Sequence, residues 1–240
     1  MNFIKNIFKI FLFALLAASM ATSPGIVSAE TENVVAGESI HYDIRKFGVK
    51  VGDAEFVFKG PATKDNKPFL LLTFTSRAMK FLDEEKIYMD PTTFYPMIVE
   101  RDLNIFGKKE KIREDYVHEA GEVRITKSAN GKTIRQVVHK TGPIDNVYCF
   151  IYRFRQKKEM KENQAVLMNL PTKDVVVKFL RQEKLKINGK NTDAVLMESD
   201  PSGYDVWFDV SPAKIPLRID GSLGLARTSL IYTSTDKDKK

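Results

Sequence analysis

Apolar and polar residues alternate along most of the chain from residue 39 onward. In residues 39–45, Ile40, Tyr42 and Ile44 fall on one face, and the polar residues between them fall on the other. Strict alternation of this kind predicts a β-strand with one buried face. Comparable segments recur roughly every ten residues as far as residue 232, a spacing typical of β-barrels and β-sandwiches.

Short turn motifs separate these segments. Asn130-Gly131 and Asn188-Gly189 each lie between two alternating segments, and Asn-Gly is the strongest sequence signal for a two-residue hairpin turn. Asp65-Asn66 lies between two further segments. The sequence therefore predicts antiparallel strands that follow one another through tight turns.

Residues 143–158 are the one stretch beyond the N-terminal segment where apolar residues follow a helical period. On a helix, the apolar residues of this stretch cover one broad arc, and Arg155 is the charged residue inside that arc. Pro143 is permitted in a first helical turn, and Lys157 and Lys158 suit a helix C-terminus. The same stretch is also rich in β-formers. A strand would place four aromatic residues on one face: Tyr148, Phe150, Tyr152 and Phe154. Both interpretations fit the residues, and the flanking residues favour the helix.

Together these patterns predict a mainly β protein. We expect a single curled antiparallel sheet, or open barrel, of about twelve strands with one central helix packed on it. The chain shows no internal repeat, no low-complexity linker and no shift in composition. We therefore expect a single β-rich exported domain over residues 30–240.

Residues 1–29 have the pattern of a cleavable signal peptide. Lys5 and Lys9 precede a short apolar core at residues 10–18, and the small residues of Val27-Ser28-Ala29 suit cleavage after Ala29. An uncleaved N-terminal anchor is the alternative, although the apolar run is short for a membrane span. Export of this kind predicts a periplasmic location.

After cleavage, we expect the chain not to be integral to the membrane. A membrane-spanning barrel needs an outward apolar band about 25 Å tall, whereas Lys111, Arg113 and Arg135 stand in mid-strand positions. Cys149 is the only cysteine, which leaves no internal disulfide and no lipidated cysteine behind the apolar core. We expect Cys149 to be a small buried side chain near the helix.

The sequence contains no recognisable catalytic or metal-binding motif. His41, His118 and His139 lie on separate predicted strands, and none has a second histidine or carboxylate at ligand spacing. We expect the carboxylate clusters Asp83-Glu84-Glu85 and Glu198-Ser199-Asp200 to be solvated loops. The sequence thus predicts a protein that is not an enzyme and uses no cofactor or metal. A hydrolase acting on cell-wall or lipid polymers is a minor alternative, with His118 or His139 as its candidate residues.

The chain is basic, with a formal net charge of +7 and clusters of Lys and Arg at residues 108–113, 153–158 and 178–186. Export argues against a nucleic acid partner, and no aromatic residues interleave with these clusters as in a base-stacking groove. The charge instead predicts anionic lipid head groups or glycans as partners, alongside envelope proteins.

Three stretches resemble a family of bacterial exported proteins catalogued as domain of unknown function 3108. Residues 37–56 resemble its Gly-Glu-x-Leu-x-Tyr opening, with Val51 and Gly52 near the family's Ala-Gly. Residues 144–153 resemble its Leu-Asp-x-Leu-Ser-x-x-Tyr-x-x-Arg helix, although Tyr148 or Cys149 stands where the family often has Ser. Residues 206–224 resemble its closing Trp and Pro-Leu-Arg motifs. The resemblance implies an antiparallel β-protein with one helix packed on the sheet, and it implies no catalytic residue, cofactor or partner.

Two functions are consistent with these expectations. The first is a non-enzymatic envelope scaffold or interaction module whose core is filled by its own side chains. The alternative is a periplasmic carrier or binder of a lipid or another amphipathic ligand, held in a groove between the helix and the sheet. The residues predicted to line that groove and meet a head group are Tyr148, Tyr152, Phe154, Arg153 and Arg155.

Overall fold

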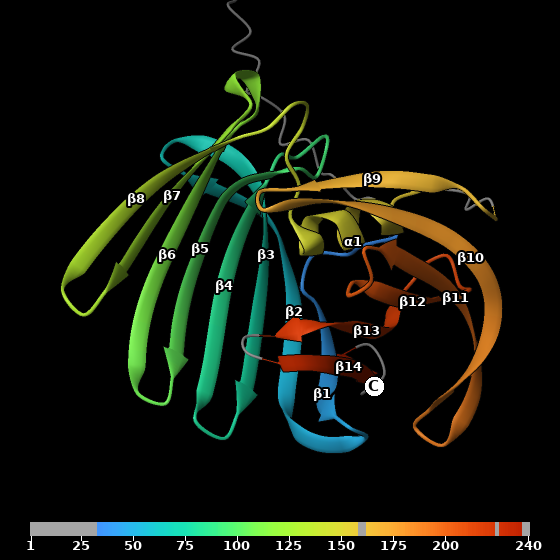
Figure 1. Ribbon diagram of the computed structural model, residues 1–240. Helices are drawn as coiled ribbons and strands as arrows, with labels where there is room; N and C mark the ends of the chain where they lie inside the picture. Colours follow the sequence, from blue (N-terminus) through green and yellow to red (C-terminus); the bar gives the residue numbers. More distant parts are fainter. Residues whose placement is uncertain (1–32, 158–161, 224–225, 237–240) are drawn as a thin grey trace, which may run out of the picture.

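The computed structural model describes residues 33–157, 162–223 and 226–236, which form one antiparallel sheet of fourteen strands and one α-helix (Figure 1). Residues 1–29, predicted to be a signal peptide, lie outside the described residues. The strands are β1 (Glu38–Lys46), β2 (Val49–Lys64), β3 (Lys67–Ala78), β4 (Phe81–Met89), β5 (Pro96–Ile105), β6 (Lys108–Val117), β7 (Glu122–Ala129), β8 (Lys132–His139), β9 (Ala165–Leu170), β10 (Lys173–Ile187), β11 (Lys190–Asp200), β12 (Asp205–Asp209), β13 (Pro216–Leu223) and β14 (Ala226–Thr235). The predicted fold class is confirmed, with fourteen strands in place of about twelve.

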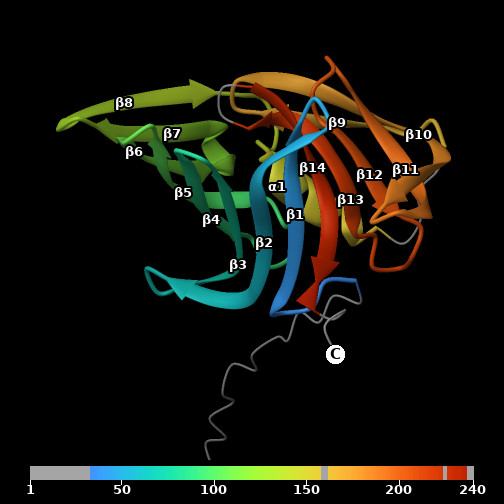
Figure 2. The same ribbon diagram turned by 90° about the horizontal axis from the view of Figure 1, so that it is seen from below.

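The order across the sheet is β8-β7-β6-β5-β4-β3-β2-β1-β14-β13-β12-β11-β10-β9. Every neighbouring pair except β1 and β14 is therefore consecutive in sequence, and β8 and β9 are the two edges of an open sheet. The sheet curls around α1 (Val147–Arg155), which lies in its concavity (Figures 1 and 2). Within the described residues, no helix has the length and apolar character needed to cross a bilayer.

Residues 147–155 are thus helical, and the strand interpretation of this stretch is wrong. The Asn146 side chain accepts hydrogen bonds from the backbone N–H groups of Tyr148, at 2.9 Å, and Cys149, at 3.4 Å. Asparagine is favoured at this position because it satisfies donors that the first helical turn leaves free.

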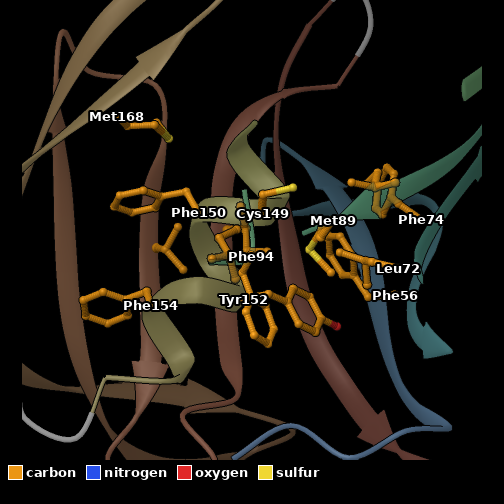
Figure 3. Close-up of a cluster of buried hydrophobic side chains, with 14 of the residues drawn as sticks. Phe56, Leu72, Phe74, Met89, Phe94, Cys149, Phe150, Tyr152, Phe154 and Met168 are labelled. Carbon is orange, nitrogen blue, oxygen red and sulfur yellow. The ribbon is translucent and has the colours of Figure 1, made fainter. Parts of the chain in front are cut away.

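The main core fills the space between α1 and the concave face. Figure 3 shows Phe150 and Phe154 on one side of α1, and Phe56 and Phe74, which belong to the strands, on the other side. The rings of Phe56 and Phe74 have centroids 4.6 Å apart, a distance suited to aromatic packing. Cys149 is buried, as predicted. A second, smaller cluster comprises Ile187, Ala194, Leu196, Trp207 and Leu217.

Both predicted Asn-Gly hairpins are confirmed. Asn130-Gly131 joins β7 to β8, with φ of 52° and 72°, and Asn188-Gly189 joins β10 to β11, with φ of 50° and 80°. Positive φ at both central residues is what a type I′ turn requires, and Asn and Gly adopt it at little cost.

The prediction of solvated loops at the two carboxylate clusters is wrong. Asp83-Glu84-Glu85 lies within β4, and Glu198-Ser199-Asp200 lies within β11. Asp83 is 0% exposed and Glu85 is 7% exposed, whereas Glu84 between them is exposed. Acidic residues are uncommon in strands, but here Asp83 and Glu85 face the concave side and meet an arginine on the neighbouring strand.

Candidate functional site

Three of the five residues predicted to contact a ligand lie in the interior. Tyr152 and Phe154 pack against aromatic side chains of the sheet. Arg155 is 0% exposed, and its guanidinium donates to both carboxylate oxygens of Glu38, at 2.6 and 2.9 Å. Further donors of Arg155 bind the backbone oxygens of Ala213 and Asn33. These three side chains are therefore engaged by the protein itself.

Arg153 and Tyr148 are less buried. Arg153 donates to both carboxylate oxygens of Asp145, and its guanidinium lies 4.0 Å from the centre of the Tyr95 ring. The ring of Tyr148 packs against Phe74, with centroids 4.7 Å apart. Of the five residues, Tyr148 lines the cleft described below, and the other four do not.

The side of α1 that carries Phe150 and Ile151 is closely packed. The space between Phe150 and Ile151 on α1 and Phe208 on the sheet measures about 10 Å³. A hole of that size holds at most one water molecule. Side chains therefore fill this part of the interface between helix and sheet, where an acyl chain would need room.

The α1 cleft is a hollow of about 240 Å³ beside the N-terminal end of the helix. Strands β4–β6 form one wall, and the segment from Tyr204 to β14 forms the other. The lining residues are Glu85, Val99, Arg101, Ile112, Glu114, Asn146, Val147, Tyr148, Tyr204, Ile219, Asp220, Gly221, Thr228 and Leu230. The volume equals roughly eight water molecules at about 30 Å³ each, and it lies below the range of about 300–1,000 Å³ for drug-sized ligands. The cleft therefore suits a compact ligand.

Asp83, Glu85 and Arg101 form a buried ionic group at this cleft. Arg101 Nε donates to Asp83 Oδ1 at 2.7 Å, Arg101 Nη2 donates to Asp83 Oδ2, and Nε lies 3.4 Å from Glu85 Oε1. Burial raises the pKa of Glu85 to about 8, with Arg101 acting against the shift and Asp83 adding to it. Arg101 is shared with Asp83, so Glu85 is left largely protonated at neutral pH.

Glu114 and Thr228 add polar groups to opposite walls. Burial raises the pKa of Glu114, while the Tyr116 hydroxyl donates to its Oε2 at 2.6 Å. Thr228 Oγ1 is buried and has no hydrogen-bond partner within the described chain. Three other buried side-chain atoms share this condition, namely Ser76 Oγ, Tyr152 OH and Gln156 Nε2. Thr228 is the one of the four residues that lines the cleft.

This arrangement can bind a ligand through hydrogen bonds and charge. Two carboxyl groups of raised pKa and an unpartnered hydroxyl face an apolar surface that includes Val99 and Leu230. A donor supplied by a ligand would stabilise the ionised carboxylates, which burial disfavours. In the part of the chain that the structure describes, no group of three or more His, Cys, Asp or Glu side chains is placed to hold a metal ion.

A larger hollow of about 680 Å³ lies over the outer face of β3–β7. Charged side chains on this face pair with one another: Glu100 meets Lys64 at 2.7 Å and Arg113 at 3.1 Å. Exposed ion pairs of this kind are worth little energetically and are already satisfied. The α1 cleft, whose polar groups are incompletely paired, is therefore the stronger candidate.

Of the residues that line the cleft, sequence reasoning named Tyr148 alone as a ligand residue. Among those it missed are the four polar residues on which the candidate site depends: Glu85, Arg101, Glu114 and Thr228. A signal was present in β4, where Asp83 and Glu85 share their alternation phase with the apolar Ile87 and Met89. Charged residues in the buried phase of a strand are informative because charge is rarely buried without a partner.

Comparison with known proteins finds no curated protein and no solved structure that matches this chain. A family model described as "Protein of unknown function (DUF3108)" matches residues 39–226. This match spans α1, nearly all of the sheet and most of the α1 cleft, and it confirms the resemblance found in the sequence. The chain belongs to the family described as Protein of unknown function (DUF3108).

Proposed function

We propose that this chain is a non-catalytic binding protein that holds a compact amphipathic ligand in the α1 cleft. The observation that supports the proposal is the meeting of Glu85, Arg101 and Thr228 around a partly apolar hollow of about 240 Å³. The Thr228 hydroxyl has no partner within the described chain, and Glu85 shares its arginine with Asp83. Incompletely paired buried polar groups cost stability, so a ligand that pairs them would gain affinity.

The proposed ligand carries an amine or hydroxyl donor next to a short apolar group. Glu85 and Glu114 add two carboxyl groups to the Asp83–Arg101 pair, so the polar wall becomes acidic when they ionise. A bound ammonium group would favour that ionised form. The apolar part of the ligand would contact side chains such as Val99.

A cleft-filling substitution at Gly221 tests the proposal. Gly221 lies on β13 at the cleft, and a Cβ there would meet its nearest neighbour, the Gly203 carbonyl oxygen, at an ordinary 3.5 Å. Gly221→Leu therefore occupies the cleft without deleting a native side chain. We expect the wild-type chain to bind hexylamine in titration calorimetry, and Gly221→Leu to lose that binding.

The matched control is Lys111→Gln, on the outer face of the sheet, which should bind hexylamine as the wild type does. Hexanoate has the same apolar chain with an anionic group, and it should bind more weakly than hexylamine. Equal affinity of the wild type and Gly221→Leu for hexylamine would contradict the proposal.

A second candidate function is an envelope interaction module, and the two open edges of the sheet favour it. Ile134 and Val137 on β8, and Leu167 on β9, are large apolar side chains with exposed fractions of 66%, 49% and 59%. An edge strand offers unpaired backbone groups to a partner strand. Ile134→Lys with Val137→Lys should then abolish cross-linking of the chain to a specific envelope protein; a cross-link that persists would argue against this role.

We further propose that residues 1–29 direct export to the periplasm and are removed there. The basic start, the apolar core and the small residues before the cleavage point support this. The intact mass of protein released by osmotic shock should correspond to a chain that begins at Glu30. A mass that retains residues 1–29 would refute the cleavage.

A further inference from the structure

Three neighbouring hairpin turns carry large apolar side chains in solvent. They are Phe47 between β1 and β2, Met79 between β3 and β4, and Phe106 between β5 and β6, exposed by 95%, 100% and 71%. Alternate turns of an antiparallel meander fall at the same end of the sheet, so these three lie along its lower edge in Figure 1. From the first turn to the third is four strand spacings, roughly 19 Å. We call this end the hairpin-tip surface.

Two of these turns hold phenylalanine in a backbone conformation that disfavours it. Phe47-Gly48 has φ of 50° and 82°, and Phe106-Gly107 has φ of 52° and 84°. The Asn130-Gly131 and Asn188-Gly189 turns have nearly the same angles, with the residue that this conformation prefers. A bulky residue at positive φ is a genuine outlier. The exposed rings gain little from packing within the fold. The presence of phenylalanine at these two positions is therefore better explained by a contact outside the fold.

The same turns are uniformly basic. Residues 45–50, 77–82 and 104–109 contain seven Lys or Arg residues and no Asp or Glu. Three of the seven pair with nearby carboxylates: Lys50 with Asp43 and Asp53, Arg45 with Asp43, and Arg77 with Glu84. Lys46, Lys80, Lys108 and Lys109 form no ion pair with any other described residue.

The opposite end of the same strands differs in both respects. Its turns contain Asp65, Asp90 and Glu119, and Phe94 in the turn between β4 and β5 is only 4% exposed although its φ is also positive, at 60°. Among the described turns that join β1 to β7, large exposed apolar side chains beside cations therefore lie at one end of the sheet.

We propose that the hairpin-tip surface docks on an anionic lipid bilayer. Phe47, Met79 and Phe106 enter the head-group region, and the lysines beside them lie over anionic head groups. Apolar insertion and electrostatic attraction are the two contributions that together hold peripheral proteins at such membranes. The backbone N–H of Phe106 donates to the Lys80 carbonyl oxygen at 2.8 Å, which fixes two of the three tips relative to each other. This surface is separate from the α1 cleft, so the inference does not depend on the proposed ligand.

The decisive variant is Phe47→Asn combined with Phe106→Asn. It installs the Asn-Gly turns that the chain already uses elsewhere, so the fold should be retained while the inserting rings are removed. The protein is purified after export in a bacterial host, with its N-terminus determined by mass spectrometry, and mixed with sedimenting vesicles of phosphatidylglycerol and phosphatidylcholine. We expect binding to fall by at least about tenfold for each phenylalanine removed.

Asn66→Gly, a turn substitution at the opposite end of the sheet, is the matched control and should bind these vesicles as the wild type does. Vesicles of phosphatidylcholine alone should bind the wild type weakly. Lys80→Gln should weaken binding to the anionic vesicles about fivefold.

A position-specific probe separates tip insertion from any other membrane contact. Cys149 is buried and is the only cysteine, so a cysteine placed at Met79 can be labelled selectively with an environment-sensitive dye. We expect the dye at Met79→Cys to shift to the blue on adding anionic vesicles, and the dye at Asn66→Cys to stay unchanged.

Several outcomes would overturn the proposal. The double asparagine variant could bind the vesicles as tightly as the wild type, or the dye at Met79→Cys could show no shift. The wild type could bind neutral and anionic vesicles equally. A chain that ignores vesicles but loses a co-purifying protein in the double variant would have a protein interface here instead.

Discussion

Arg155 at the C-terminal end of α1 and Arg101 beside its N-terminal end both pair with carboxylates on the concave face, but the two groups are satisfied to different degrees. Arg155 and Glu38 form a two-bonded pair, and backbone oxygens take further donors of the guanidinium. Arg101 is shared between Asp83 and Glu85, and the pKa of Glu85 is raised to about 8.

This difference in pairing indicates a structural role for the Arg155 group and a binding role for the Arg101 group. The Arg155 pair joins α1 to β1. Glu38 also borders a hollow of about 260 Å³, but both of its carboxylate oxygens accept hydrogen bonds from Arg155. The Arg101 group borders a cleft and has carboxyl groups with spare acceptor capacity. Burial of charge alone therefore does not identify the site; incomplete pairing next to open space does.

The largest effect on stability is expected at the Arg155–Glu38 pair, whose hydrogen bonds are satisfied. Glu38→Gln removes the charge that neutralises Arg155 and leaves a buried guanidinium unpaired. We expect the free energy of unfolding to fall by about 3–5 kcal/mol, measured by urea denaturation. Asp53→Asn on the neighbouring strand, whose partner Lys50 is exposed, is the control and should change stability by less than about 1 kcal/mol. A loss of similar size in both variants would erase the contrast between buried and exposed pairs.

The pH dependence of stability should reveal the titration of Glu85, the incompletely paired carboxyl group beside Arg101. Folding raises the pKa of Glu85 from an ordinary value near 4.5 to about 8, so between these values the folded state binds more protons than the unfolded state. The contribution of Glu85 to stability is therefore complete below about pH 4.5 and is lost as the pH rises through 8, with a slope of at most about 1.4 kcal/mol per pH unit between these values. Glu85→Gln should flatten this decline in urea denaturation measured across that range, and an unchanged slope would show that Glu85 does not titrate in this way.

Ligand binding should depend on the same proton. Because Glu85 is largely protonated below pH 8, we expect the affinity for hexylamine to rise about tenfold as the pH increases through that value. In Glu85→Gln the affinity should be low and independent of pH over this range. Calorimetric titration at several pH values measures the effect, and a pH dependence retained in Glu85→Gln would assign the proton to another group.

The smallest effect is expected at Thr228. Thr228→Val replaces an unpartnered buried hydroxyl with a methyl group of similar size. We expect the ligand-free protein to become more stable by about 1 kcal/mol, while its affinity for a ligand with a hydroxyl or amine donor decreases. Thermal unfolding with and without hexylamine distinguishes the two effects. Destabilisation of the ligand-free protein would mean that the hydroxyl is satisfied in the folded state.

The local sequence predicted the strands, two hairpins and the helix because each follows from short-range chemistry. Alternation at period two requires a half-buried strand, and Asn-Gly supplies the positive φ of a type I′ turn. Residues 143–158 show a helical period, and the structure adds Asn146 as the cap that begins the helix. The five predicted ligand residues came from the same local pattern, which gives the face of a helix but not what covers that face.

By itself, then, the sequence determined a mainly β chain of antiparallel strands, in a curled sheet or open barrel, and favoured one helix packed on it. Only the tertiary structure decided that Arg155 is bound by Glu38, that Glu85 and Arg101 meet across β4 and β5, and that Phe47 and Phe106 share one end of the sheet. The physical reason is sequence separation. Periodicity and turn preference act between residues a few positions apart, whereas these contacts join strands whose register and curvature are set by the packing of the whole sheet.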